Sequence, residues 1–451
     1  MNGAVAFPLD VPELEIAASG GSRVRRTVLP SGVRILSEQV PGAQSATVGF
    51  WVAVGSRDEV PVTYGSTHFL EHLLFKGTTS RSALDIAVSF DAVGGEHNAM
   101  TAKEYTCYYA KVRDLDLPMA VQVLADMFTS SLLDAEEFES ERGVILEELA
   151  MADDDPSDVV SERFFEAVFG DHELGRPIGG NAAAISAVTR EAVWEHYRAN
   201  YRPQDLVISV AGAVDHDELV GWTIAALETA GWNLHLSAVP VARRDPTLDP
   251  IDRGSPLVVV NRPLEQANLL LGVAGLHAAD ERRPALTVLN SVLGGGMSSR
   301  LFQEIRERRG LAYSVYSFAA SYSDAGVLGL YAGCSPKRAP QVAGLMLDEF
   351  RRLAEGGITD EELARAQGQL GGASALALED SDTRMTRLGR SELTTGEFAD
   401  LDETLRRIAS VTANGVRELA AELAARPLSI AAVGAVDAKS LAGLDGTAVA
   451  A

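Results

Sequence analysis

Two histidines and a glutamate stand close together in the stretch STHFLEHLLFKGT, residues 66–78: His68, Glu71 and His72. On an α-helix, residues four apart share one face, so the two imidazoles can point at a single metal ion while Glu71 lies beside them. A catalytic zinc site holds three protein ligands and leaves a fourth position for a water, whose pKa falls towards neutral. A carboxylate next to that water, but not bound to the metal, is the natural general base. The alternative is a helix whose histidines are ordinary hydrogen-bonded core residues.

Two histidines are one protein ligand short, so a third must come from another segment. The acidic stretch ESERGVILEELA offers Glu141, Glu147 and Glu148. On a helix, Glu141 and Glu148 are seven apart and share a face, whereas Glu147 is rotated away. The pattern alone leaves the identity of the third ligand open.

The elements that must position these residues occur twice along the chain. In each half, strands lead into a short helix, a glycine-rich turn, further strand and a long helix. The segment HLSAVPVARRDPTLDPIDRGSP has no apolar period and divides the halves. The pattern predicts an α+β fold of two tandem homologous domains, each a mixed, mainly antiparallel β-sheet packed with α-helices. We assign five segments: a flexible leader (1–24), an N-terminal catalytic zinc domain (25–235), a linker (236–255), a C-terminal homologous domain without metal (256–440) and a tail (441–451).

The second copy lacks the chemistry of the first. Where the first half has His-x-x-Glu-His, the matching helix of the second half has ALTVLNSVLGGG, which contains no metal ligand. We therefore expect the polar chemistry in the N-terminal half.

Composition and charge exclude several classes of protein. The 451 residues carry a net charge of −24, the opposite of the basic surface of a nucleic-acid-binding protein. No stretch approaches the length of a membrane span, and the first residues lack the apolar core of a signal peptide. We therefore expect a cytoplasmic protein without a nucleic-acid or membrane partner. Cys107 and Cys334 are too few for a disulfide framework or a cysteine zinc site.

Several motifs together resemble a known family. GSTHFLEHLLFKGT, followed by Glu148 in ERGVILEEL, is similar to the pitrilysin and mitochondrial processing peptidase family of zinc metallopeptidases, which carry the inverted motif His-x-x-Glu-His. GGEHNAMTAKEYTCYYAKV and LGGGMSSRLFQEIRERRGLAYSVYS agree with the same family, and the resemblance runs from about residue 25 to residue 435. The length resembles the bacterial, processing-peptidase-like type, whose chains are not fused in pairs.

The resemblance implies a zinc-dependent endopeptidase with one Zn²⁺ per chain. It assigns His68, His72 and Glu148 as the metal ligands and Glu71 as the general base that acts on the attacking water. It assigns Glu141 as a carboxylate that steadies the site from outside the ligand set.

Two further segments would hold a peptide substrate. In the family, the strand that corresponds to GGEHNAMTAKEYTCYY binds an extended substrate through its backbone, and Asn98 and Ala99 match positions beside the scissile region. The loop LGGGMSS, with Gly294, Gly295 and Gly296, would contact substrate, although the same glycines also suit a plain turn.

An arginine and a tyrosine of the second half complete the implied site. Arg306 and Tyr313 match a family pair in which the tyrosine stabilises the oxyanion and the arginine holds the substrate backbone. Because this chain is a single unit, the family architecture implies a homodimer whose active sites are shared between subunits. Its substrates would be short or unfolded peptides that enter a closed chamber, and the acidic charge favours basic, presequence-like peptides.

Three alternatives keep the fold but change the function. A non-catalytic scaffold subunit is one, and the complete set of expected ligands and base counts against it. A catalytic subunit that needs a different partner chain is another, and the presence of Arg306 and Tyr313 in this chain favours self-assembly. A binding protein with a purely structural zinc would need a fourth protein ligand, which the sequence does not offer.

Overall fold

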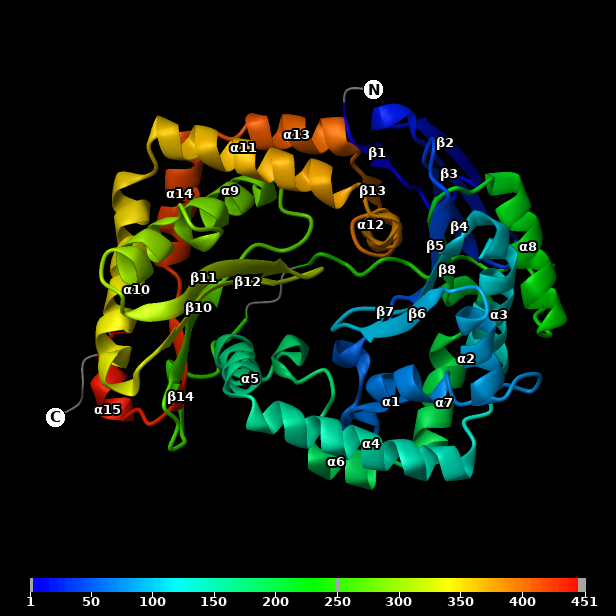
Figure 1. Ribbon diagram of the computed structural model, residues 1–451, viewed down its shortest axis with the longest axis horizontal. Helices are drawn as coiled ribbons and strands as arrows, with labels where there is room; N and C mark the ends of the chain where they lie inside the picture. The colour runs from blue at the N-terminus through cyan, green and yellow to red at the C-terminus, as the bar shows by residue number, and fades with distance from the viewer. Residues whose placement is uncertain (1–2, 248–250, 445–451) are drawn as a thin grey trace. The chain divides into compact units, whose positions relative to one another are not determined.

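Two β-sheets carry the fold, one of seven strands and one of five (Figure 1). The computed structural model describes residues 3–247 and 251–444. The strands of the first sheet follow the order β2 (Glu13–Ala17), β3 (Arg23–Val28), β4 (Arg34–Gln39), β8 (Val207–Gly212), β5 (Ser45–Val52), β7 (Thr106–Arg113) and β6 (Glu96–Thr101). Those of the second follow the order β11 (Ala312–Ser321), β12 (Gly326–Cys334), β10 (Ala267–Ala274), β14 (Ser429–Gly434) and β9 (Leu257–Asn261). A short pair, β1 (Val5–Ala6) with β13 (Glu397–Phe398), forms a separate two-stranded sheet.

The two sheets share the same five-strand arrangement. The order β4-β8-β5-β7-β6 in the first sheet corresponds to β9-β14-β10-β12-β11 in the second. In both, the first two strands are parallel and every following neighbour is antiparallel. The hairpin β2-β3 is an addition to the first sheet. This repetition confirms the predicted α+β fold with two homologous halves and mixed, mainly antiparallel sheets.

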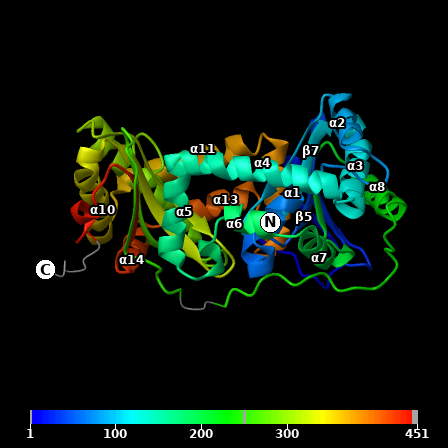
Figure 2. The same ribbon diagram turned by 90° about the horizontal axis from the view of Figure 1, so that it is seen from below.

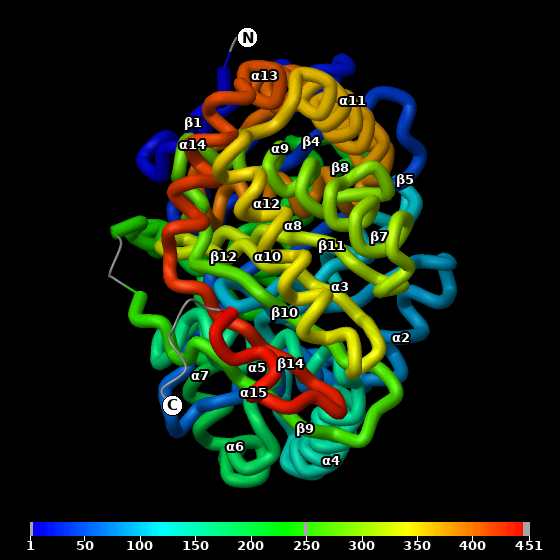
Figure 3. Tube along the Cα trace, turned by 90° about the vertical axis from the view of Figure 1, so that its left-hand side faces the viewer, coloured from blue at the N-terminus to red at the C-terminus, as the bar shows by residue number. Residues whose placement is uncertain are grey.

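The helices pack on the faces of these sheets. They are α1 (Ser66–Leu73), α2 (Ala83–Asp91), α3 (Leu117–Ser130), α4 (Ala135–Asp154), α5 (Pro156–Phe169), α6 (Ala182–Ala187), α7 (Arg190–Asn200), α8 (His216–Thr229), α9 (Arg283–Gly294), α10 (Ala339–Gly356), α11 (Asp360–Ala377), α12 (Ser381–Leu393), α13 (Leu401–Ala409), α14 (Ala413–Ala424) and α15 (Ala438–Leu441). One face of the first sheet forms a core with α1, α2, α3, α7 and α8. One face of the second sheet is covered by α9, α10 and α14 (Figure 3).

The opposite face of each sheet is covered by a helix from the other half of the sequence. The chain divides into two compact units, one made of residues up to 149, 177–243 and 374–404, the other of residues 150–176, 244–373 and 405 onwards. Helix α12 thus packs on β5 and β8 of the first sheet, and α5 packs on the corresponding β10 and β14 of the second. The two halves thus exchange one helix each. Helix α5 follows α4 in the first half, and α12 follows the corresponding helix α11 in the second half.

Glycines in the strands allow these helices to approach closely. A Cβ atom at Gly49 of β5 would lie 2.5 Å from Sδ of Met385 in α12. A Cβ atom at Gly272 of β10 would lie 2.7 Å from Cζ of Phe164 in α5. Both positions therefore need a residue without a side chain.

The predicted flexible leader, residues 1–24, differs from the structure. Residues 13–17 form β2, which pairs along its whole length with β3. The alternation of Leu14 and Ile16 explains the difference, because it gives β2 one apolar face, and Ile16 is buried beside Val24. Residues 1 and 2 of the leader, residues 248–250 of the predicted linker and residues 445–451 of the predicted tail lie outside the described residues. In the described part of the chain, no helix is both long and apolar enough to cross a membrane.

Candidate metal centre

Helix α1 carries the His-x-x-Glu-His motif and is fixed at its N-terminal end by a buried carboxylate. The helix starts after Gly65, whose φ of 86° lies in the left-handed region. The carboxylate of Glu59 accepts hydrogen bonds from the backbone N–H groups of Gly65 and Thr67, both at 2.8 Å. These N–H groups have no partner within a helix, so Glu59 satisfies them and also complements the helix dipole. The apolar side chains of α1 are buried and leave the histidines on the remaining face.

Helix α4 lies alongside α1 and supplies the acidic residues (Figure 2). Phe138 of α4 stacks on Phe69 of α1 with ring centroids 4.4 Å apart, and the guanidinium of Arg142 lies over both rings. Arg142 also donates hydrogen bonds to two backbone carbonyls at the end of α6. This packing fixes the rotation of α4 so that Glu141 and Glu148 face the histidines of α1.

Three side chains bring one donor atom each to a common point. Nε2 of His68 and Nε2 of His72 are 3.3 Å apart. Oε2 of Glu148 lies 3.6 Å from the first of these nitrogens and 3.4 Å from the second. Two ligand atoms bound to zinc at tetrahedral geometry are separated by about 3.3–3.6 Å, so the donor set fits a zinc ion with a fourth position open. Among the described residues, this is the one group of three His, Cys, Asp or Glu donors close enough together to share an ion.

His72 is held at the nitrogen that points away from this group. Its Nδ1 donates a hydrogen bond of 2.9 Å to Oε2 of Glu141, which leaves the lone pair of Nε2 for a metal. The other oxygen, Oε1, accepts from Nζ of Lys76 at 2.6 Å. Burial pushes the pKa of Glu141 upwards, but the hydrogen bonds from Lys76 and His72 outweigh it, so the pKa lies below its ordinary value. Glu141 is therefore an ionised carboxylate although it is only 3% exposed.

His68 has a different environment. Burial lowers the pKa of His68, and the neighbouring His72 lowers it further, so the imidazole is neutral, which is the form that binds a metal. Its Nδ1 is buried and has no hydrogen-bond partner in the described chain. A Cβ atom added at Gly179 would lie 3.6 Å from this nitrogen, so the backbone of Gly179 closes that side of the ring.

Glu71 lies on α1 between the two histidines but outside the group of three donors. Its side chain is half-buried, and its negative charge is close enough to raise the pKa of His68 against the effect of burial. The structure thus provides a carboxylate beside the metal position that is not used as a ligand. This is the placement that a general base requires.

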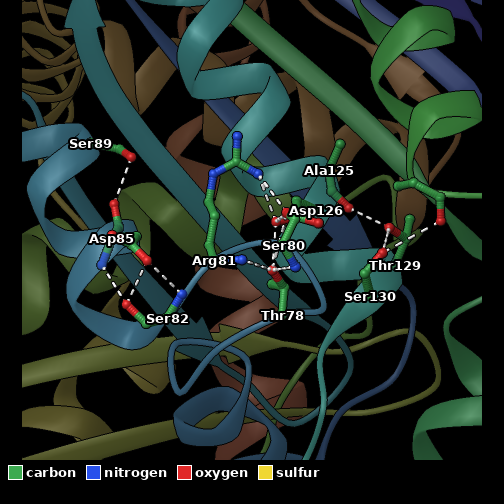
Figure 4. A network of polar contacts seen from close by, with 11 residues as sticks. Thr78, Ser80, Arg81, Ser82, Asp85, Ser89, Ala125, Asp126, Thr129 and Ser130 are labelled. Carbon is green, nitrogen blue, oxygen red and sulfur yellow. Dashed lines mark hydrogen bonds and ion pairs between the residues drawn. The ribbon is translucent and has the colours of Figure 1, made fainter.

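The turn that follows α1 is fixed by a single aspartate. The chain bends at Gly77, whose φ is 118°. Oγ1 of Thr78, Oγ of Ser80 and the guanidinium of Arg81 all donate to Oδ2 of Asp126 in α3, at 2.6, 2.7 and 2.7 Å (Figure 4). This network anchors the segment directly after Lys76.

Asn98 and Ala99 lie on β6, an edge strand of the first sheet within the described part of the chain. The backbone N–H of Ala99 donates to Oδ1 of Asn98 at 2.8 Å and is therefore directed away from the ladder with β7. The neighbouring His97 stacks on Phe90, with ring centroids 4.4 Å apart, so His97 is a packing residue.

The three glycines at the end of α9 have different environments. Gly294 is buried, and a Cβ atom there would lie 2.2 Å from the backbone nitrogen of Ser317, so this glycine is required by packing. Gly295 is exposed and Gly296 is half-buried. Contact of the three glycines with substrate stays a prediction.

Arg306 and Tyr313 of the second unit lie against each other. The guanidinium of Arg306 donates to the backbone carbonyl of Tyr313 at 2.7 Å and lies 4.3 Å from the centre of the tyrosine ring. The ring of Phe302 contacts the same guanidinium, at 4.7 Å. Tyr313 is 78% exposed, so its hydroxyl is accessible from solvent. The catalytic roles of this pair stay predictions.

Comparison with protein families assigns both halves of the chain. Residues 34–182, which include the complete donor group, match the family described as insulinase (peptidase family M16). Residues 187–370 match the peptidase M16 inactive domain. The chain belongs to peptidase family M16.

Relatives of this M16 chain extend over most of its length. An uncharacterized zinc protease of Streptomyces coelicolor is 50% identical over 415 residues, which cover 92% of this chain and 90% of the relative. The uncharacterized zinc protease YmxG of Bacillus subtilis is 38% identical over 413 residues, covering 91% and 98%.

Two solved structures have the same fold as this chain. The peptidase M16 inactive domain from Pseudomonas fluorescens superposes with a TM-score of 0.82 at 19% identity and covers 92% of this chain and 99% of that chain. A protease from Helicobacter pylori superposes with a TM-score of 0.81 at 23% identity, covering 91% and 99%. At these identities the similarity shows the fold alone.

Two residues of this M16 site are absent from the sequence prediction. Lys76 follows His72 by four positions, a spacing that places both residues on the same side of the chain. The sequence could therefore have indicated Lys76. Glu59 lies in a loop and caps α1 through backbone groups, and nothing in its sequence position indicates that role.

Proposed function

We propose that this chain is a zinc-dependent metalloendopeptidase that cleaves short or unfolded peptides. The observation that carries the proposal is the triangle of donor atoms from His68, His72 and Glu148, with Glu71 beside it on the same helix. The names of the Streptomyces coelicolor and Bacillus subtilis relatives, both zinc proteases, support the same chemistry.

The residues of the site have distinct roles in the proposed reaction. His68, His72 and Glu148 would hold a zinc ion, which would supply Lewis-acid chemistry for the scissile carbonyl and for a water. Glu71 takes a proton from the attacking water and delivers it to the leaving amine. Glu141 keeps His72 in the tautomer whose Nε2 is free for the metal.

We propose that β6 binds the substrate as an additional strand. The N–H of Ala99 is bonded only locally, to the side chain of Asn98 in the preceding position. A substrate carbonyl would replace the Asn98 oxygen at this N–H, and the released amide would become available for a second bond to the peptide backbone. The exposed Gly295 and Gly296 are proposed as further substrate contacts, and the acidic charge of the chain favours basic peptides.

The proposed working form is a homodimer with a closed chamber and shared active sites. The exposed hydroxyl of Tyr313 would stabilise the oxyanion, and Arg306 would hold the substrate backbone, each serving the zinc site of the partner chain. The contact between Arg306 and Tyr313 supports these two roles, because it orders both side chains before substrate arrives. We propose a cytoplasmic location, which suits the free, buried thiols of Cys107 and Cys334.

Replacement of Glu71 tests the peptidase proposal. We expect the wild type to hold one zinc ion per chain and to cleave members of a mixed peptide library. Glu71→Gln should keep the zinc and lose at least about a hundredfold in kcat, since general-base catalysis contributes on that order. Equal inactivity of both proteins, with zinc bound, would overturn the assignment, and so would equal activity.

Mixing of two inactive variants tests the shared sites. Glu71→Gln lacks the base and Tyr313→Phe lacks the proposed oxyanion donor. If sites are shared, a mixture contains dimers with one site composed of two intact halves, and part of the activity returns. No recovery, or elution of the active protein at the mass of one chain, would contradict the shared-site dimer.

A further inference from the structure

Lys76 contacts the metal site through one intermediate residue. It lies four residues after His72, just beyond the end of α1, and its backbone N–H donates to the carbonyl of Leu73 at 3.1 Å. Its ammonium group is 2.6 Å from Oε1 of Glu141, whose Oε2 is 2.9 Å from Nδ1 of His72. A lysine, a carboxylate and a ligand imidazole thus form one line of hydrogen bonds that ends at the donor group.

The lysine determines how Glu141 can present its oxygens. A carboxylate bonded at one oxygen can still swing about its last side-chain torsion, because that torsion is broad. Bonds at both oxygens remove this freedom. Glu141 is almost fully buried, and Lys76 and His72 each supply a donor to one of its two oxygens.

Attachment of α4 to α1 does not depend on Lys76. The stack of Phe69 on Phe138 and the contacts of Arg142 already join the two helices. The side chain of Lys76 remains one-third exposed, and its ammonium group contacts the carboxylate of Glu141. The contribution of the lysine is therefore local to the carboxylate.

We infer that Lys76 is a positioning residue of the metal site, which fixes Glu141 so that Glu141 fixes the ring of His72. The inference rests on the proposed zinc peptidase function and deepens it. Outer hydrogen-bond partners of metal ligands typically change activity or metal affinity by about 10–100-fold, and the indirect contact of Lys76 places its effect at the lower end.

The test compares wild type with Lys76→Met after replacement of zinc by Co²⁺, whose visible absorption reports the geometry of its ligands. We expect the variant to bind one Co²⁺ with an altered absorption spectrum. In the zinc form, kcat should fall about tenfold while KM stays within about twofold, because the substrate-binding strand is untouched. Lys76→Arg, which restores a charged donor, should recover most of the wild-type Co²⁺ spectrum and most of the wild-type kcat.

Two further variants separate this role from a general loss of stability. Arg113→Met removes a mainly exposed cation–carboxylate pair at the end of β7, Arg113 with Asp116, which is 2.9 Å long. It should leave the Co²⁺ spectrum and kcat unchanged. In a Glu141→Gln background, Lys76→Met should have no additional effect, because the contact through which it acts is already changed.

The outcomes distinguish this inference from the function on which it rests. A wild-type spectrum and kcat in Lys76→Met would overturn the role of Lys76 and leave the peptidase intact. A tenfold loss that persists in the Glu141→Gln background would also overturn it. A wild type that binds neither metal nor cleaves any peptide would overturn both.

Discussion

Glu147 and Glu148 are neighbours in α4 with different surroundings. Oε2 of Glu148 lies within 3.6 Å of both ligand nitrogens, of His68 and His72, whereas Glu147 is exposed and takes no part in the donor group. The two residues have the same chemistry and the same helix propensity, so they form a matched pair for mutation.

Substitution of these two glutamates tests the ligand set. An amide is a poor zinc ligand, so Glu148→Gln should weaken zinc binding by more than about a hundredfold, beyond the usual effect of an outer partner. Glu147→Gln should bind zinc as the wild type does. Competition with a chelator of known affinity measures both constants. Equal zinc affinity of the two variants would contradict the assignment of Glu148.

His216, which is not a member of the donor group, should make the stability of the fold depend on pH. His216 is buried between Oγ1 of Thr27, 2.9 Å from its Nε2, and Oγ of Ser37, 2.8 Å from its Nδ1. Burial lowers the pKa of His216 to about 4, and Arg25 adds to the shift, while Asp215 and Asp217 oppose it.

The sign of this effect follows from the lowered pKa. The unfolded state takes up a proton on His216 below pH 6.5, whereas the folded state does so only near pH 4. The contribution of neutral His216 to the free energy of unfolding is thus fully present above pH 6.5. It decreases by on the order of 2 kcal/mol as the pH drops to 4. His216→Gln should show a shallower fall over this window in denaturant unfolding. An unchanged slope would mean that His216 does not titrate as described.

Single residues were predictable where chemistry and spacing coincide. His68, Glu71 and His72 stand out because two imidazoles and a carboxylate share one helical face, and the structure places them there. The spacing within ESERGVILEELA did not choose a ligand, because the choice depends on how α4 is rotated against α1. That rotation comes from Phe69, Phe138 and other packing contacts far apart in the sequence.

At the scale of elements, the position of β6 at a sheet edge predicts which backbone N–H groups of a substrate are needed for binding. If a peptide adds to β6 as a strand, every second N–H of the peptide pairs with β6 and the others point away. N-methylation of single peptide bonds should therefore reduce kcat/KM at alternate positions around the cleaved bond and be tolerated between them. Cleavage assays on a series of singly methylated peptides measure this. A uniform loss, or no loss, would contradict binding by strand addition.

The sequence predicts the strand that contains Asn98, but its place at an edge emerges only from the order of pairing. Alternation of apolar residues identifies a strand and its buried face, and it carries no information about which strands become neighbours. Gly294 shows the same limit. Its sequence suggests a flexible loop, and its burial against Ser317 gives it a packing role.

At the scale of the molecule, one carboxylate joins a late helix to the first sheet. Glu392 of α12 is fully buried and pairs with Arg26 at 3.3 Å, Arg34 at 3.4 Å and Arg243 at 3.0 Å. Removal of a partner from a buried ion pair leaves uncompensated charge and costs about 3–5 kcal/mol. Glu392→Ala should lower the free energy of unfolding by this amount in denaturant titrations. The exposed Glu379, just before α12, is the control, and Glu379→Ala should change it by less than about 0.5 kcal/mol. A cost below about 1 kcal/mol for Glu392→Ala would contradict a structural role for the cluster.

The two homologous halves were predictable, but the composition of the compact units was not. Repeated elements along the sequence indicate two copies of one fold, as the matching strand orders confirm. The helical pattern of α5 and α12 shows an apolar side, and either sheet offers an apolar face to cover it. Which sheet each helix covers depends on side chains such as Phe164 and Met385 meeting particular glycines, and this lies beyond sequence periodicity.

Because α12 covers a sheet from the other half of the sequence, the first sheet is synthesised long before its covering helix. The first sheet is complete once residue 212 has been made, yet its covering helix lies in residues 381–393. At about 5–20 residues per second, roughly 10 to 35 seconds of translation separate the two. During that time the indole of Trp51 and the guanidinium groups of Arg26 and Arg34 have no α12 to cover them. The nascent chain therefore carries an unfinished face for much of its synthesis, which is a surface that molecular chaperones recognise.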